Sequence, residues 1–209
     1  MTDTVVVFTS GAEPSAADVP AGALVVAADG GADVALALGL RVDLAVGDLD
    51  SISADALAAL EAAGTPIERH PVEKDASDLE LALRAALRLG ARRVLAVGEA
   101  GGRLDHLLGT LLLLAADAWA GVELDALVGG ARVHVIRDGR ALAGEPGETL
   151  SLFALHGPAT GVSAEGLRYP LRGATLAPGT TLGLSNELAA AEVRISVETG
   201  VLLAVFPAA

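Results

Sequence analysis

Acidic residues follow two short apolar segments in the first half of the chain, at spacings that could hold a cation. Asp48 and Asp50 come after the segment that ends at Val46, and on an extended stretch both carboxylates would point the same way. Asp75 and Asp78 bracket a predicted helix start. Four carboxylates at one place repel one another unless a cation neutralises them, and hard oxygen ligands favour Mg²⁺, which often also binds phosphate. The alternative is that single aspartates cap turns or helices.

Two glycine pairs could bring backbone N–H groups close to an anion. Gly30 and Gly31 follow Asp29, and Gly101 and Gly102 lie between a predicted strand and a predicted helix. Missing side chains at such positions let an anion approach the amides at a helix start. A glycine pair is also common in a simple turn.

Two basic residues accompany these groups. Lys74, beside Asp75, is the only lysine in a chain that otherwise uses arginine, which indicates a role next to the acidic cluster or else an ordinary surface position. Arg103 could bind phosphate with its forked guanidinium, or could pair with Asp105 or Glu99.

Several common phosphate and acyl chemistries are excluded by motif. The lysine is followed by Asp75 and lacks the upstream glycines of a Walker A loop, no Gly-x-Gly-x-x-Gly follows a strand, and no Gly-x-Ser-x-Gly occurs. What remains is magnesium-dependent phosphate chemistry on another scaffold.

The elements that must position these residues alternate between short β-branched segments and longer alanine- and leucine-rich segments. This pattern predicts an α/β domain over residues 1–130, with a mainly parallel sheet and flanking helices. The predicted strands are 4–9, 24–28, 43–46, 66–69, 92–97 and 122–128, and the predicted helices are 31–38, 53–63, 77–89 and 104–119. Because the carboxyl ends of parallel strands meet at one edge, we expect the acidic, basic and glycine groups to converge there.

The residue composition of the chain changes near residue 130. Glycine and proline recur every few residues, and short alternating segments separate them, which predicts a C-terminal antiparallel β-sandwich over residues 131–209. The predicted strands are 132–137, 149–155, 167–171, 182–184, 191–197 and 201–206.

The composition of the chain limits its possible binding partners and its possible cellular location. The 209 residues carry 27 acidic and 14 basic side chains, a net charge of −13, which opposes binding to nucleic acid. The absence of cysteine excludes disulfides and thiolate zinc sites. The apolar segment 107–116 is too short to span a membrane, and the acidic start 1–4 is unlike a signal peptide, so we expect a cytoplasmic protein.

Five sequence blocks, taken in order, resemble those of the thiamine pyrophosphokinase family. They are Ala27-Ala28-Asp29-Gly30-Gly31-Ala32, Val46-Gly47-Asp48-Leu49-Asp50-Ser51-Ile52, Lys74-Asp75-Ala76-Ser77-Asp78-Leu79-Glu80, Gly101-Gly102-Arg103-Leu104-Asp105-His106, and Gly166-Leu167-Arg168-Tyr169-Pro170-Leu171 with Gly183-Leu184-Ser185-Asn186-Glu187. The resemblance covers nearly the whole chain. It departs at Thr110, where many relatives carry Asn, and at Ser10-Gly11, where a Gly-Gly pair is usual.

The resemblance implies transfer of pyrophosphate from ATP to the hydroxyl of thiamine, in a homodimer whose thiamine site lies between subunits. Its implied roles fall into four groups. Mg²⁺ would be bound by Asp48, Asp50, Asp75 and Asp78; ATP by Asp29, Gly30, Gly31, Gly101, Gly102, Arg103 and Asp105; thiamine by Ser185 and Asn186; and catalysis would use Asp50, Asp78 and Lys74.

Three other functions fit part of the sequence. Asp48-Leu49-Asp50 alone also matches the Asp-x-Asp metal site of a glycosyltransferase or the nucleophile pair of a dehalogenase-type phosphatase, although the phosphatase would carry Thr or Val at Ile52. A non-catalytic nucleotide- or thiamine-binding protein of the same fold is the third, and AMP release separates it from the enzyme.

Overall fold

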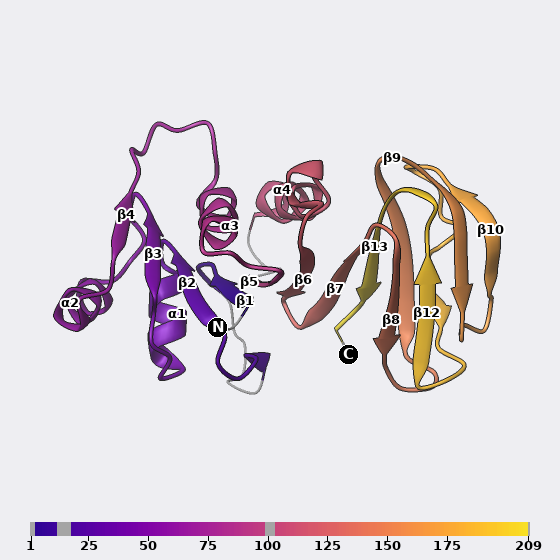
Figure 1. Cartoon of the computed structure of the whole chain (residues 1–209), viewed down its shortest axis with the longest axis horizontal. Coiled ribbons are helices and arrows are strands. Elements are labelled where there is room, and N and C mark those ends of the chain that lie inside the picture. Colours follow the sequence, from indigo (N-terminus) through magenta and orange to yellow (C-terminus); the bar gives the residue numbers. More distant parts are fainter. Residues whose placement is uncertain (1–2, 12–17, 99–102, 209) are drawn as a thin grey trace. The chain divides into compact units, whose positions relative to one another are not determined.

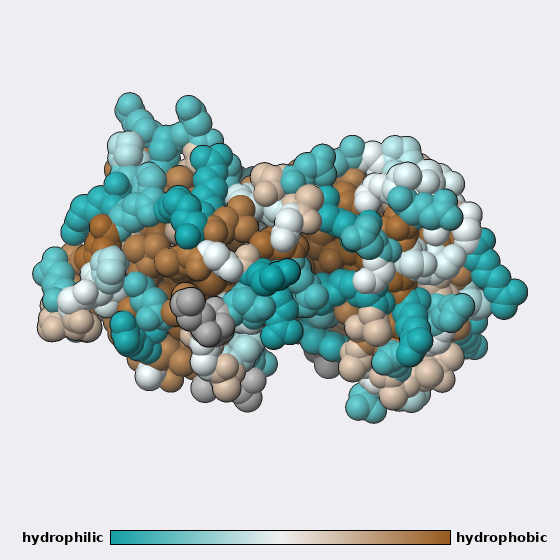
Figure 2. All heavy atoms as spheres, in the orientation of Figure 1, coloured by the Kyte–Doolittle hydropathy of each residue, from teal (hydrophilic) through white to brown (hydrophobic). Residues whose placement is uncertain are grey.

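The computed structural model describes residues 3–11, 18–98 and 103–208, which form two compact units (Figure 1). The first unit comprises residues 1–110 and 121–130, and the second comprises residues 111–120 and 131–209. On the face drawn in Figure 2, hydrophilic side chains border the apolar ones in each unit. No helix in the described part of the chain is long and apolar enough to cross a membrane.

The first unit is built on a parallel sheet, as predicted. Its strands lie in the order β4-β3-β2-β1-β5-β6, and each neighbouring pair is parallel. Their bounds are β1 Thr4–Phe8, β2 Leu24–Ala28, β3 Leu44–Gly47, β4 Ile67–Arg69, β5 Arg93–Gly98 and β6 Glu123–Val128. The chain runs outward from β1 to β4 and then crosses to β5 on the other side of β1. A sheet of this kind binds ligands at the carboxyl ends of its strands.

Three helices cover this sheet. They are α1 Gly31–Ala37, α2 Ala54–Ala63 and α3 Asp78–Arg88. α1 and α2 bury the side of the sheet that carries Val6, Phe8 and Ala45, whereas α3 packs against β1, β2 and β3. The predicted start of α3 is confirmed, because the Ser77 hydroxyl accepts a hydrogen bond from the Glu80 amide at 3.2 Å.

The second unit is antiparallel, as predicted, and its strands are β7 Ala131–Ile136, β8 Gly139–Ala143, β9 Thr149–Glu165, β10 Leu171–Leu176, β11 Asn186–Glu187, β12 Glu192–Ser196 and β13 Thr199–Phe206. β9 is the central element, because its first half pairs with β13 and its second half pairs with β10 and β12. Between the halves, His156 and Gly161 have positive φ angles of 62° and 64°, which bend the strand. The buried side chains of both halves enclose one apolar core.

After residue 103, the structure differs from the predicted elements in three places. The helix predicted over 104–119 is α4 Leu104–Leu114, because Ala116 is extended and the chain turns through a 3-10 helix at Asp117–Trp119. The strand predicted at 182–184 is a turn, in which the Leu184 amide donates to the Thr181 carbonyl at 3.0 Å. β8 lies where no strand was predicted.

Candidate functional site

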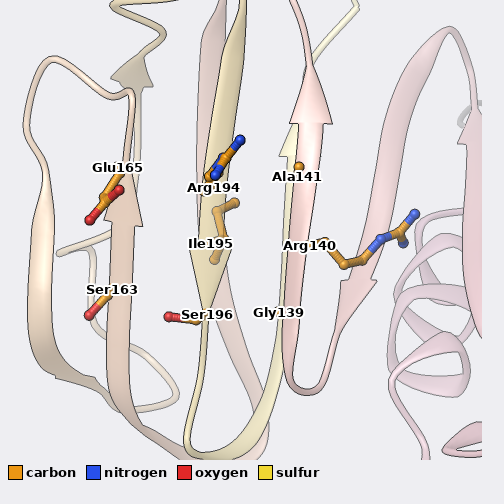
Figure 3. A pocket seen from close by; sticks show the side chains of 8 residues that line it. All are labelled: Gly139, Arg140, Ala141, Ser163, Glu165, Arg194, Ile195 and Ser196. Atoms are coloured by element: carbon orange, nitrogen blue, oxygen red, sulfur yellow. The ribbon is translucent and has the colours of Figure 1, made fainter.

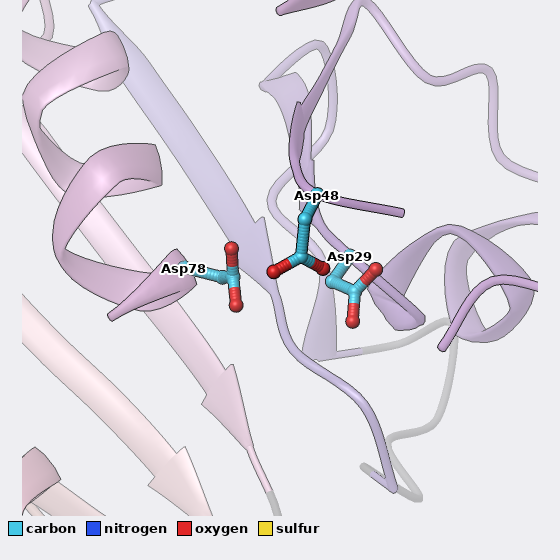
Figure 4. Close-up of side chains that lie close together, drawn as sticks. All are labelled: Asp29, Asp48 and Asp78. Carbon is cyan, nitrogen blue, oxygen red and sulfur yellow. The ribbon is translucent and has the colours of Figure 1, made fainter. Parts of the chain in front are cut away.

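Three aspartates from three different places in the sequence meet at the carboxyl edge of the parallel sheet. Asp29 directly follows β2, Asp48 directly follows β3, and Asp78 is the first residue of α3. Each offers a carboxylate oxygen, and these oxygens lie within 4.8 Å of one another. Figure 4 shows the Asp48 side chain between those of Asp78 and Asp29. We call Asp29, Asp48 and Asp78 the carboxylate cluster.

Gly47 makes the close approach of these side chains possible. A Cβ atom at this position would lie 3.0 Å from Asp78 Oδ1 and 3.3 Å from Asp29 Cβ. Gly47 also has a φ of 144°, which side chains other than glycine rarely adopt. The last residue of β3 is therefore glycine because the cluster needs both the space and the backbone conformation.

Lys74 lies against the cluster and neutralises part of its charge. Its Nζ donates to Asp48 Oδ2 at 2.6 Å and lies 2.9 Å from Asp78 Oδ1. The hydrogen bond from Lys74 lowers the pKa of Asp48 below its ordinary value. Burial alone would lower the pKa of Lys74, but the hydrogen bond to Asp48 and the nearby charge of Asp78 outweigh it, so the pKa of the ammonium is raised.

Asp29 is the most buried member of the cluster. It is 7% exposed, and its backbone has a φ of 49°, in the left-handed region that is uncommon for residues other than glycine. Burial raises the pKa of Asp29, and the charges of Asp78 and Asp50 act in the same direction, although hydrogen bonds from Ser51 oppose them. Without a cation nearby, its charged form is costly.

Asp50 and Asp75 are not members of the group within the described part of the chain. The expectation that Asp48 and Asp50 lie on an extended stretch is wrong, because Leu49 between them has a φ of 65° and a buried side chain. The turn leaves Asp50 exposed, where its Oδ1 accepts a hydrogen bond from the Ser51 hydroxyl at 2.9 Å. Asp75 is also exposed.

The glycine pair after β2 has a packing role. A Cβ atom on Gly31 would lie 2.1 Å from the Phe8 carbonyl oxygen, and one on Gly30 would lie 2.7 Å from Ser10 Oγ. Gly31 therefore allows α1 to start against β1. The second pair, Gly101 and Gly102, lies outside the described residues.

Arg103 and Asp105 form a forked ion pair on the surface. Arg103 Nε donates to Asp105 Oδ1 at 3.2 Å and its Nη2 donates to Oδ2 at 2.6 Å. The Arg103 guanidinium lowers the pKa of Asp105 to about 2. The guanidinium fork is thus directed at a carboxylate in the first turn of α4, which is one of the two alternatives that the sequence left open.

Ser185 and Asn186 lie in the second unit and differ in exposure. Ser185 is exposed, with a φ of 53°, and its amide donates to Ser151 Oγ at 3.0 Å. Asn186 is 7% exposed, and its amide group bonds both backbone groups of Tyr169, accepting from the Tyr169 N–H at 3.1 Å and donating to its carbonyl at 2.7 Å. Asn186 therefore fixes the backbone of the segment that carries Tyr169.

Comparison with known proteins assigns the chain to a family. Residues 20–122 match the model described as the catalytic domain of thiamin pyrophosphokinase, and residues 133–202 match its vitamin B1 binding domain. The chain belongs to the thiamine pyrophosphokinase family. The thiamine pyrophosphokinase of Bacillus subtilis is 28% identical over 161 residues, covering 76% of this chain and 75% of the relative.

Solved structures bearing the family name share the fold. A Bacillus subtilis thiamine pyrophosphokinase superposes with a TM-score of 0.86 at 23% identity, covering 99% of both chains. One from Geobacillus thermodenitrificans gives 0.82 at 24% identity, covering 99% of this chain and 98% of the other. The Candida albicans protein gives 0.78 at 15% identity, covering 97% and 89%.

Two features of the family's residue blocks in this chain were not anticipated from the sequence. Asp29 joins the aspartates, whereas we expected it to bind ATP; the signal was its position at a strand end, which it shares with Asp48. Tyr169 is 60% exposed and has the Arg168 guanidinium 5.5 Å from its ring centre. The hydrogen bonds between Tyr169 and Asn186 could not be predicted from the sequence, because the two residues lie 17 positions apart and Tyr169 is in no strand.

The second unit also carries a shallow pocket of about 430 Å³ on the surface of β8, β9 and β12 (Figure 3). Its lining includes none of the predicted site residues. Arg194 in this pocket already pairs with Glu192 at 2.8 Å, and Glu165 adds a second acidic group. The Arg140 side chain extends away from the others.

Proposed function

We propose that this chain transfers the pyrophosphate group of ATP to the hydroxyl of thiamine, giving thiamine diphosphate and AMP. The observation that carries the proposal is the convergence of Asp29, Asp48 and Asp78 with Lys74 at the ligand-binding edge of a parallel sheet, in a chain of this family. Phosphoryl and pyrophosphoryl transfers depend mainly on positioning and on neutralising charge, which these groups can supply.

The carboxylate cluster suits Mg²⁺. Three carboxylates within 4.8 Å form a hard oxygen donor set, and burial, which raises the pKa of Asp29, makes its ionised form costly unless a cation is bound beside it. We propose Asp29, Asp48 and Asp78 as ligands, and Asp50 and Asp75 as outer residues that contact the metal through water. When bound, Mg²⁺ would neutralise and orient the phosphates of ATP.

The reaction forms a bond between the thiamine oxygen and the β-phosphorus and breaks the bond from that phosphorus to the oxygen that leaves with AMP. The hydroxyl loses its proton during this attack. Asp50 is our candidate to take it, because it is exposed beside the cluster and the Ser51 hydroxyl orients its Oδ1.

ATP would be bound along the same edge. We propose that amides near Gly30 contact its phosphates, since Gly30 caps the start of α1 without a side chain. Arg103 and Asp105 remain candidates, and ATP would have to compete with their ion pair, which is exposed and therefore inexpensive to break. Roles for Gly101 and Gly102 stay predictions.

Thiamine would be bound by residues 131–209, and ATP by residues 1–130. Ser185 offers an exposed hydroxyl, and exposed apolar side chains accompany it, namely Tyr169, Leu182 and Leu184 at 60%, 57% and 48%. This combination suits a ring with a few polar groups. We propose that Asn186 acts by holding the Tyr169 segment in place. A cytoplasmic location stays a prediction.

A homodimer would explain the unusual surface of α4. Leu104, Leu108 and Leu112 are spaced one turn apart and are 78%, 56% and 38% exposed, whereas such a helix normally buries its apolar face. We propose that a second copy covers this stripe. Leu108→Arg should then sediment as a monomer, while the control Val72→Arg, at another exposed apolar residue, should sediment like the wild type. Equal sedimentation of both variants would contradict the assignment.

The proposed reaction is tested by incubating the protein with ATP, thiamine and Mg²⁺ and measuring AMP. We expect AMP release that depends on thiamine and stops with EDTA. Asp48→Asn should lose it, whereas Asp55→Asn, which removes an exposed acidic group in the first turn of α2, should keep it. If both variants keep full activity, the carboxylate cluster has no role in the mechanism. The Asp-x-Asp glycosyltransferase and phosphatase alternatives are disfavoured because, among the described residues, the carboxylate cluster contains Asp48 and not Asp50, which the turn at Leu49 leaves exposed.

A further inference from the structure

Lys74 holds the position at the carboxylate cluster that a divalent cation would also need. Its ammonium contacts Asp48 at 2.6 Å and Asp78 at 2.9 Å, two of the three residues proposed as magnesium ligands. Its side chain is only 12% exposed, which is unusual for a lysine and shows that the contact is built into the fold. The single lysine of the chain is therefore held against the carboxylate cluster.

We propose that Lys74 is an internal counter-ion that neutralises the carboxylate cluster before the metal binds and is displaced from it when the metal arrives. The proposal rests on the proposed magnesium site. An ammonium and a divalent cation repel each other at a few ångströms, and both compete for the Asp48 and Asp78 oxygens. Without either cation, three carboxylates within 4.8 Å would repel one another.

The place of Lys74 in the chain permits such a displacement. It lies in the connection between β4, which ends at Arg69, and α3, which begins at Asp78, and its neighbours Glu73 and Asp75 are exposed. Four flexible side-chain bonds carry the ammonium, so it can move without any change in the strand or the helix. After displacement it stays beside the metal site, where it can bind the polyphosphate of ATP. Phosphate binding by Lys74 would therefore follow metal loading.

Metal affinity measures the competition directly. We would titrate Mg²⁺ into the wild type, Lys74→Met, Lys74→Arg and Arg84→Met by calorimetry at constant ionic strength. Arg84→Met is the matched control, because it removes the same charge from α3, where Arg84 pairs with Glu80 and not with the cluster. Lys74→Met should bind Mg²⁺ about tenfold more tightly or better. Lys74→Arg, which keeps the competing charge, and Arg84→Met should stay within about twofold of the wild type.

A second measurement uses the wild type alone and does not depend on a variant that folds. Because the chain has one lysine, ¹⁵N-lysine labelling gives one side-chain ammonium signal. We expect this signal to shift and its protons to exchange faster with water as Mg²⁺ is added, since the ion pairs open. Sodium chloride free of divalent cations, added to the same ionic strength, should leave the ammonium signal unchanged.

The outcomes separate this inference from the proposed function. Equal Mg²⁺ affinity in Lys74→Met and the wild type, or an ammonium signal that does not change while Mg²⁺ binds, would overturn the counter-ion role even if the wild type makes thiamine diphosphate. Displacement of Lys74 in a protein that releases no AMP would support the counter-ion role and refute the proposed reaction.

Discussion

Replacing Gly31 with alanine should destabilise the first unit strongly, because the residue is enclosed by backbone. The added Cβ would lie 2.1 Å from the Phe8 carbonyl oxygen, 2.5 Å from the Phe8 carbonyl carbon and 2.9 Å from the Thr9 nitrogen. Ordinary contacts begin at 3.4 Å, so α1 and β1 must separate by about 1.3 Å at their point of contact. Overpacking of this kind costs about 3 kcal/mol, near the upper end of its usual range, because no flexible side chain can move aside.

The matched control is the same substitution at Gly109. That glycine lies inside α4, has no positive φ, and would place its Cβ in open space. Alanine there should stabilise the helix by up to about 1 kcal/mol. The two Gly→Ala variants are thus expected to have free energies of unfolding that change in opposite directions.

Urea unfolding followed by far-ultraviolet circular dichroism measures this effect, since α1, α2 and α3 all belong to the first unit. Fluorescence of the single tryptophan, Trp119, reports on the second unit and serves as an internal reference. If Gly31→Ala unfolds at the wild-type urea concentration yet binds ATP poorly, the glycine serves the ligand and the packing argument is refuted.

Three further outcomes are expected. Asn186→Ala should lower the free energy of unfolding by about 2 kcal/mol in chemical denaturation, because both backbone groups of Tyr169 lose a partner, and an unchanged value would contradict the bridging role. Burial would raise the pKa of Glu148, but the Glu145 amide and Arg132 outweigh it and the pKa is lowered. Its ionised form therefore stabilises the fold above pH 4.5, and this stabilisation is lost as the pH falls further. Glu148→Gln should be less stable than the wild type at neutral pH and equally stable in acid. A stability difference that stays constant across a pH series of thermal melts would refute this. Asp48→Asn should slow AMP formation more than about a hundredfold in a steady-state assay, with an unchanged circular dichroism spectrum, and a loss below tenfold would argue against a metal ligand.

The parallel sheet and the convergence at its edge could be predicted because local signals agree with the fold. Most strands of the first unit are short β-branched or alanine-rich segments, and α2 and α3 begin after the capping residues Ser53 and Ser77. Once the sheet is parallel, its topology alone brings Asp29, Asp48 and Asp78 to one edge.

The composition of the cluster could not be predicted from spacing. Two residues of separation place Asp48 and Asp50 together only on an extended chain, and nothing in the sequence indicates that Leu49 takes a left-handed conformation. The buried side chain of Leu49 supplies the reason, because tertiary packing holds the turn that directs Asp50 outward. In the same way, Asp29 enters because Gly47 leaves space for it.

The second unit was harder to predict because its strands are defined by distant partners. β9 was predicted only over 149–155, yet it continues to Glu165 by exchanging β13 for β10 and β12 across glycines that read as turns. β8 carries few β-branched residues and is a strand because β12 pairs with it. The β-propensity of a segment is weak evidence where pairing with a distant strand decides whether the segment is a strand.

The proposed reaction is tested most directly by identifying both products of ATP, thiamine and Mg²⁺ by mass spectrometry with ATP labelled in its β-phosphate. We expect AMP and thiamine diphosphate in equal amounts, with the label in the thiamine diphosphate. Formation of ADP with thiamine monophosphate, or ATP turnover that ignores thiamine, would contradict it.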